Sequence, residues 1–150
     1  GQDATRWALL HPAPHDRPHL TPDHLVQRES NPLFRVRYAY ARTRALTRNA
    51  EALGFTSDPG ARNTPRPLEL LLADHPRVLT ATATHHTPHR LTHHLVAIAD
   101  ALLPLLPDVL PVGEEEPEAA HRSRLALAEA AGVVLAGGLS LLGIDAPEHL

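Results

Sequence analysis

Apolar residues recur three or four positions apart along most of this chain, the spacing that places them on one face of an α-helix. This periodicity predicts helices over residues 3–10, 21–30, 31–53, 68–73, 77–83, 88–103 and 119–142. No stretch of useful length alternates apolar and polar residues with the period of two that a half-buried strand shows. We therefore expect an all-α fold, a helical bundle of about six to seven helices without a β-sheet.

Local signals at the helix ends support these boundaries. Asn31 can cap a helix that begins at Pro32, because proline at the first helical position gives up an N–H that has no partner there. Gly54 and Gly143 each follow the last periodic residue of a helix, where glycine commonly ends the helix. We divide the chain into a linker or stem segment, residues 1–30, and a helical bundle, residues 31–150.

Composition adds a few constraints. The 150 residues suit one domain with a substantial core. Cysteine is absent, which excludes disulfides and thiolate chemistry and suits a cytoplasmic protein. No uninterrupted apolar run reaches the ~18 residues of a membrane span, so we expect no membrane partner. The first residue is Gly1 rather than methionine, which we interpret as a cut or processed N-terminus.

The basic residues are segregated, although the net charge of −3 gives the whole chain no attraction for polyanions. All fourteen basic residues are arginine, and six of them lie between residues 28 and 48 together with one acid, Glu29. Three of the five aromatic residues, Phe34, Tyr38 and Tyr40, lie in the same stretch. Guanidinium groups bind phosphate through a planar fork of donors, and aromatic rings stack on unpaired bases. The stretch is typical of a nucleic-acid contact or, alternatively, of an exposed helix that arginine keeps soluble.

Helical geometry divides this arginine-rich segment into three faces, at ~100° per residue. The face predicted to meet the core carries Phe34, Tyr38, Ala41, Ala45 and Ala52. A neighbouring face carries Arg37, Tyr40, Arg44 and Arg48. The other flank carries Arg35 and Arg42.

Histidine is abundant, with twelve residues, five of them within residues 85–94. His85, His89 and His93 have the i, i+4 spacing of ligands on one helical face, as a zinc site requires. Pro88 is expected to start a helix between them, however, and no carboxylate or cysteine completes a ligand set. We therefore interpret these residues as surface and capping histidines, and we predict no metal and no cofactor.

No group of residues suggests catalysis. The few serines and threonines lie in predicted turns or caps, and the acidic run of residues 114–118 lies in a predicted loop. A solvated loop does not provide the fixed, dry site that an acid–base pair needs. We predict no catalytic residue in this chain. Gly137 and Gly138 follow no strand, and we expect them to permit close helix packing rather than to bind phosphate.

Four motifs, in the same order along the chain, carry a family resemblance. They are Gly1-x-Asp-Ala-x-Arg6, the block Asn31–Arg42, Pro88-His-Arg-Leu91, and the C-terminal pattern that includes Arg124, Leu125, Leu127, Gly138, Leu139, Leu141, Leu142, Gly143, Pro147 and Glu148. Together they resemble the DALR anticodon-binding domain of arginyl-tRNA synthetases, an all-helical domain of class Ia synthetases. Arg37 and Tyr40 depart from the glutamine and histidine usual in that family. The family's aromatic cluster is replaced by Leu102, Leu105 and Leu106, and Pro104 and Pro107 interrupt that helix.

The resemblance implies a module that binds the anticodon stem-loop of tRNA-Arg. Such a module supports arginyl-tRNA aminoacylation as part of, or as a relative of, an arginine–tRNA ligase whose catalytic domain is the expected partner. The residues expected to contact RNA are Arg35, Arg37, Tyr40, Arg42, Arg44 and Arg48, with Pro147, Glu148, His149 and Leu150 near the site. The lost aromatic cluster and the negative charge leave an alternative, a divergent domain of this fold that serves protein–protein interaction or regulation.

Overall fold

The protein is described by a computed structural model that covers residues 1–18, 21, 30–60 and 64–150. Within these ranges no strand occurs, and the helices are α1 (Gln2–Leu10), α2 (Pro32–Ala52), α3 (Arg66–Ala73), α4 (His75–His85), α5 (Pro88–Leu102), the 3-10 helix η2 (Leu103–Asp108) and α6 (Ala119–Leu141). The predicted all-α fold is confirmed. The helix predicted over 21–30 falls mainly on residues outside the described ranges.

Proline begins most of these helices. It occupies the first or second position of α2, α3, α4, α5 and η2, where its missing N–H leaves no helical hydrogen bond unmade. The Asn31 side chain caps α2, because its Oδ1 accepts hydrogen bonds from the backbone N–H groups of Leu33 (3.1 Å) and Phe34 (3.4 Å). The many prolines of this chain are therefore compatible with a helical fold.

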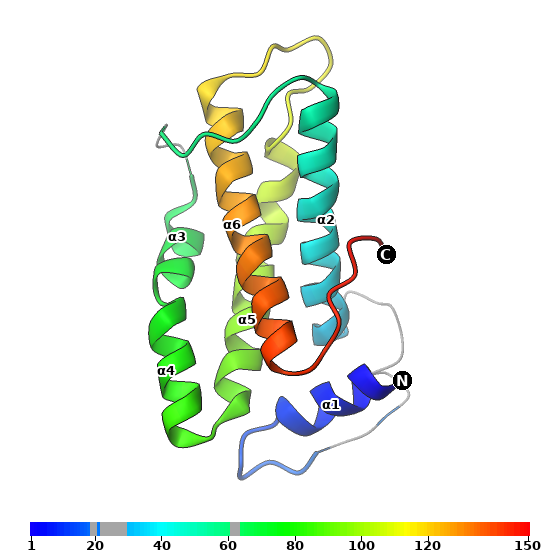
Figure 1. Ribbon diagram of the computed structural model, residues 1–150, viewed down its shortest axis with the longest axis vertical. Coiled ribbons are helices and arrows are strands. Elements are labelled where there is room, and N and C mark those ends of the chain that lie inside the picture. Colours follow the sequence, from blue (N-terminus) through cyan, green and yellow to red (C-terminus); the bar gives the residue numbers. More distant parts are fainter. Residues whose placement is uncertain (19–20, 22–29, 61–63) are drawn as a thin grey trace.

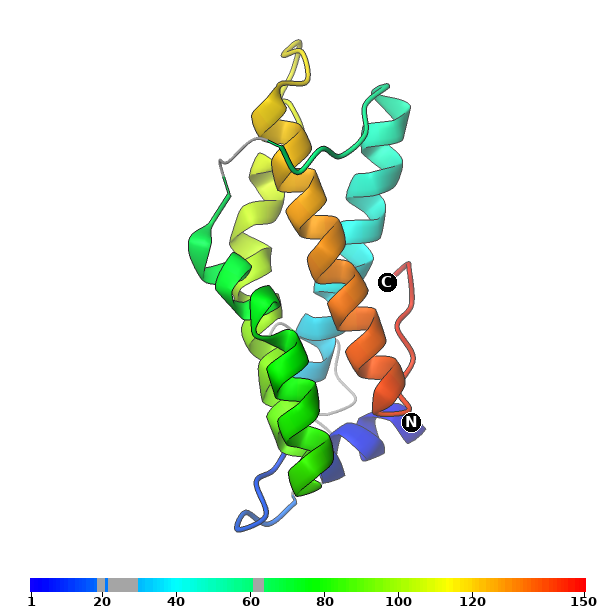
Figure 2. The same ribbon diagram turned by 60° about the vertical axis from the view of Figure 1, so that its left-hand side comes forward.

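Three long helices form the body of the molecule. Helices α2, α5 and α6 run side by side, α3 and α4 lie along the side of the bundle away from α2, and α1 crosses one end (Figures 1 and 2). Helix α5 packs on α1, α2, α3, α4 and α6, so it is the centre of the fold. Val36, Ile98 and Leu135 are fully buried where α2, α5 and α6 meet.

The buried face of α2 differs from the predicted one. Leu33, Val36 and Leu46 are buried, whereas Phe34 and Tyr38, which were predicted to face the core, are only half-buried. The rings of Phe34 and Tyr38 stack on each other instead, with their centroids 5.6 Å apart. Of the other predicted core positions, Ala41 is buried and Ala52 is exposed. The prediction was wrong for the rings and Ala52 because α2 packs against both α5 and α6, whose contacts cover its aliphatic side.

Glycines let α6 approach its neighbours closely. A Cβ placed on Gly138 would lie 2.6 Å from a methyl group of Leu95 on α5, and one on Gly132 would lie 2.4 Å from the hydroxyl of Thr43 on α2. A Cβ on Gly137 would meet nothing within 4 Å. The predicted packing role is thus confirmed for Gly138 and wrong for Gly137, while Gly132 has that role without having been predicted.

Helix α6 is long and apolar enough, by length and composition alone, to cross a membrane. The sequence argument, which considered only uninterrupted apolar runs, overlooked it. Its buried residues, among them Leu125, Leu135 and Leu139, face the interior of the bundle, and the helix packs on α2 and α5. The core helix of a helical bundle can meet the same criteria of length and composition, so the apolar character of α6 does not by itself indicate a membrane span.

Two histidines pack between α4 and α5. The rings of His75 and His94 stack nearly parallel, with centroids 5.3 Å apart, and each ring has a buried nitrogen without a hydrogen-bond partner in the described structure. Burial lowers the pKa of both imidazoles, and His75 lowers that of His94 further. Asp74 opposes this effect on His94, while Arg77 adds to it. The packing of α4 on α5 therefore favours neutral imidazoles.

Candidate nucleic-acid interface

The arginines of α2 lie on two flanks of the helix, as helical geometry predicted. On the flank that faces α5 and η2, Arg35 Nε bonds one carboxylate oxygen of Asp100 on α5 at 3.0 Å. Arg42, two turns along on the same flank, is exposed. The guanidinium group of Arg35 is about three-quarters covered, with 24% of its side chain exposed.

A cavity of about 340 Å³ opens between this flank and η2. Its walls are formed by the stacked Phe34 and Tyr38 with Arg35 and Arg42 on one side, and by Leu103, Leu106 and Pro107 on the other. An apolar slot of this kind, with an aromatic wall and guanidinium groups at its side, suits a planar ring attached to a phosphate. Sequence reasoning missed Phe34 and Tyr38 because it assigned both rings to the core.

The C-terminal segment, residues 144–150, lies beside the opposite flank of α2 (Figure 1). Arg44 Nε lies 3.4 Å from a carboxylate oxygen of Glu148, and Arg48 lies 3.4 Å from Nδ1 of His149. Arg44 and Glu148 are both about half-exposed, at 41% and 51% of the side chain. The fold therefore brings two of the predicted arginines together with residues of the predicted C-terminal group.

Arg37 lies on the same flank but is bonded internally. Its Nε donates to the backbone carbonyl of Asp145 at 3.0 Å, and another of its nitrogens bonds the Asp3 carboxylate of α1. Arg6 of α1 donates to the carbonyl of Gly143, just beyond the end of α6. We call the group of Asp3, Arg37 and Asp145 the clasp. The sequence motif that contains Asp3 was noticed, but nothing in it indicated this partner.

Tyr40 is half-buried and packs against the hydrophobic core. It lines a second cavity of about 340 Å³ between α2 and α6, together with Arg44 and Glu129. Glu129 accepts hydrogen bonds there from Thr47 and Ser57, which ties the loop after α2 to both helices. Tyr40 therefore lies on the Arg44 flank and is separated from the ring pair at the first cavity.

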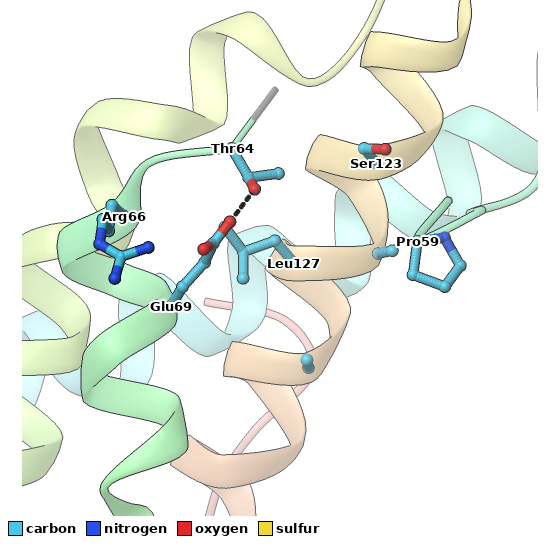
Figure 3. Close-up of a pocket in the computed structure, with 8 residues that line it drawn as sticks. Pro59, Thr64, Arg66, Glu69, Ser123 and Leu127 are labelled. Carbon is cyan, nitrogen blue, oxygen red and sulfur yellow. Dashed lines mark hydrogen bonds between the residues drawn. The ribbon is translucent and has the colours of Figure 1, made fainter. Parts of the chain in front are cut away.

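A third cavity, about 540 Å³, lies between α3 and α6 (Figure 3). Three of its polar side chains, Thr64, Glu69 and Ser123, are already hydrogen-bonded. The Thr64 hydroxyl donates to the Glu69 carboxylate, and the Ser123 hydroxyl donates to the backbone carbonyl of Asp58. Because these groups are already paired, and because α3 lies on the side of α6 away from α2, the cavity adds nothing to the basic surface.

The histidine cluster does not form a metal site in the described structure. His85 ends α4, whereas His89 and His93 lie on α5, so the three do not share one helical face. His93 Nε2 lies 3.0 Å from the carbonyl oxygen of His11, and the His11 ring stacks on Trp7. Among the residues that the structure describes, no three ligand-type side chains are placed to bind a metal ion.

Comparison with known proteins places this chain in a family. The sequence model of the DALR anticodon binding domain matches residues 36–150, which is most of the chain. The chain belongs to the DALR anticodon binding domain family. It is 39% identical over 160 residues to the arginine–tRNA ligase of Frankia alni, and 38% identical over 164 residues to that of Renibacterium salmoninarum. Each alignment covers all of this chain and 29% of the ligase, so the chain spans less than a third of these relatives.

Solved structures show the same fold. The DALR domain described here superposes on Thermus thermophilus arginyl-tRNA synthetase with a TM-score of 0.77 and 26% identity, over 99% of this chain and 26% of that one. A structure titled as a putative arginyl-tRNA synthetase from Campylobacter jejuni matches with a TM-score of 0.81 over 100% of this chain and 34% of the other. At 19% identity, the second match supports the shared fold alone.

The leucines that replace the family's aromatic cluster are part of the core. Leu102, Leu105 and Leu106 are each less than a tenth exposed. Pro104 stands at the start of η2 and Pro107 inside it, so α5 changes to a 3-10 helix at this point. In this DALR domain the segment supports the wall of the first cavity through Leu106, and the aromatic rings at that cavity come from α2 instead.

Proposed function

We propose that this DALR domain binds the anticodon stem-loop of an arginine-accepting tRNA, as the recognition part of an arginine–tRNA ligase. The observation that carries the proposal is the cavity between α2 and η2, where two stacked rings lie beside two arginines. Anticodon loops present splayed bases next to phosphates, and single-stranded loops of this kind are the usual target of sequence-specific RNA binding. The family match supports the same function.

The proposed roles follow from the positions of the side chains. Phe34 and Tyr38 stack on an unpaired base, a contact worth about 1–3 kcal/mol per base. Arg42 at the rim of the cavity binds a phosphate. Arg35 binds a second phosphate, which replaces the Asp100 carboxylate as its partner. On the other flank Arg44 and Arg48 bind phosphates, with Tyr40 and residues 147–150 beside them.

The rest of the proposal concerns the longer protein. Aminoacylation itself requires a catalytic domain, and the ligase relatives imply that one is part of the longer protein. From the sequence we interpret these 150 residues as containing no catalytic residue. We propose that such a domain is the partner of this one, and that the protein acts in the cytoplasm as a component of translation. The leucines that motivated a protein-interaction role are buried, so no specific observation favours that alternative.

The test is binding of a labelled tRNA-Arg anticodon stem-loop and of a non-cognate stem-loop across a salt series. Replacing Arg42 with glutamine should lower the affinity and reduce the slope of log K against log salt by about 0.7–0.9, the value of one phosphate contact. Tyr38→Leu should lower the affinity about 5-fold to 160-fold and leave the slope unchanged, because stacking releases no counterions.

Arg66→Gln is the matched control, since Arg66 is an exposed arginine on α3, away from α2. It should leave the affinity close to that of the wild type. Equal losses for Arg66→Gln and Arg42→Gln would show a general charge effect and refute the site. Absence of binding by the wild type at low salt would refute the function itself.

A further inference from the structure

We propose that Asp3 and Arg37 are positioning residues. They hold the C-terminal segment, residues 144–150, against α2, so that this segment, Arg44 and Arg48 form one RNA-binding surface. The inference rests on the proposed function and deepens it, because it assigns Arg37 a role other than phosphate contact.

The geometry of the clasp joins three elements that are distant in sequence. Arg37 of α2 donates to the backbone carbonyl of Asp145 at 3.0 Å and bonds the Asp3 carboxylate of α1. The same carboxylate oxygen of Asp3 accepts from the backbone N–H of Asp145 at 3.4 Å. Each member thus bonds the other two, and the start of the C-terminal segment is held through its backbone rather than through a replaceable side chain.

Burial separates Arg37 from the arginines that face solvent. The side chains of Arg37 and Asp3 are each 22% exposed, against 41% for Arg44. Arg37 and Arg35 differ in their partners: Asp3, which pairs with Arg37, is 22% exposed, whereas Asp100, which pairs with Arg35, is 52% exposed and open to exchange. Arg37 is also bonded to a backbone carbonyl, which a phosphate cannot displace by taking over a side-chain partner. Arg37 therefore affects RNA through the segment that it holds.

Ile144, beside the clasp, is 3% exposed in the hydrophobic core, and Ala146 packs against that core. The residues beyond Ala146 are held weakly: their described contacts to α2 are the 3.4 Å approaches of Glu148 to Arg44 and of His149 to Arg48. Long, exposed contacts of this type stabilise little, because the side chains remain solvated and mobile. The direction in which residues 147–150 leave this anchor and lie over the basic flank accordingly depends on the clasp.

The sign of the Asp3→Ala effect distinguishes positioning from simple electrostatics. Removing an acidic group beside a basic surface should strengthen the binding of a polyanion if only charge matters. Positioning predicts the opposite, about tenfold weaker binding of the tRNA-Arg stem-loop, which corresponds to about 1.4 kcal/mol. The salt slope should stay that of the wild type, because the phosphate contacts of Arg44 and Arg48 remain.

The matched control is Asp16→Ala, which removes the same charge from the exposed loop after α1. It gives the purely electrostatic change in affinity. Arg37→Gln should behave like Asp3→Ala, whereas Arg44→Gln should reduce the slope. Asp3→Glu, which keeps the carboxylate, should restore most of the affinity. Thermal unfolding of each variant confirms that the fold is retained.

A direct readout follows the segment itself. The chain has no cysteine, so Pro147→Cys, at a half-buried position two residues after Asp145, gives a single site for a nitroxide spin label. The label should be restricted in the otherwise wild-type protein and in Asp16→Ala, and mobile in Asp3→Ala. Unchanged mobility in Asp3→Ala, or RNA affinity equal to that of Asp16→Ala, overturns the inference while the proposed function stands. If Asp3→Ala frees the label but the wild type binds no RNA, the proposed function is overturned. The anchoring of the segment by Asp3 then still stands.

Discussion

Two adjacent glycines of α6 should respond in opposite directions to the same substitution. Gly138 is buried, and an added Cβ would lie 2.6, 2.8 and 3.1 Å from three side-chain atoms of Leu95, which is itself fully buried. Gly137 is exposed, and an added Cβ there meets open space. Gly138→Ala should therefore destabilise the domain, and Gly137→Ala should stabilise it.

The magnitudes follow from two terms. Alanine in place of a helical glycine stabilises by about 0.5–1 kcal/mol, and Gly137, which lies close to the end of α6, should give the lower value. Overpacking a buried methyl costs about 2–3 kcal/mol when its neighbours cannot move away. Gly138→Ala should thus show a net loss of about 1–2 kcal/mol. For a chain of this length 1 kcal/mol is about 3 °C in Tm.

The assay is urea unfolding of the wild type and both variants, with thermal melts alongside. Leu95→Ala in the Gly138→Ala background gives a double-mutant cycle, and it should remove the penalty of the added methyl, with a coupling of about 2–3 kcal/mol. Equal stabilisation by Gly137→Ala and Gly138→Ala would refute the close approach of α6 to α5 at Leu95.

Three further predictions concern stability. The pKa values of His75 and His94 in the folded protein are lowered from the ordinary 6.5, so the unfolded chain binds more protons. The free energy of unfolding should therefore fall as the pH drops below about 6.5. Urea midpoints at pH 7.5 and 5.5 measure this fall, and His94→Leu should reduce the difference between the two midpoints. Asn31→Ala should lower the stability by about 1 kcal/mol in the same assay through loss of the α2 cap, whereas Asn31→Asp should be nearly neutral. Asp100→Asn should lower the free energy of unfolding by less than about 1 kcal/mol, because Asp100, which pairs with Arg35, is half-exposed. A loss of stability several times larger would show that the ion pair is shielded from solvent.

The sequence predicted those features of the fold that depend on neighbouring residues. Asn31, Pro32 and Gly54 mark the ends of α2 through capping and turn chemistry that acts within a few positions. The two arginine flanks were also predictable, because they follow from the geometry of one helix. Which flank faces which neighbour does not follow from that geometry.

The features that were missed depend on tertiary packing. Phe34 and Tyr38 were assigned to the core because they share one arc of the helix with three alanines, but the aliphatic side of α2 faces α5 and α6. The contact of Asp3 with Arg37 joins residues 34 positions apart, and no local pattern links them. Knowledge of the helix neighbours is needed to find the ring-lined cavity and the clasp.

The carboxylates paired with the arginines of α2 have a consequence for discrimination. Arg35, Arg37 and Arg44 each have an acidic partner, supplied by α5, α1 and the C-terminal segment respectively. A polyanion that reaches Arg35 or Arg44 would exchange one ion pair for another, so the long-range attraction of these two arginines is reduced. The exposed Arg42 has no acidic partner in the described structure. A ligand whose phosphates are not spaced to reach Arg35 and Arg44 cannot replace their acidic partners and gains no binding energy from them. On the proposed function, such pairing favours a ligand whose phosphates match these arginines over the nonspecific nucleic acid that an open basic patch would collect.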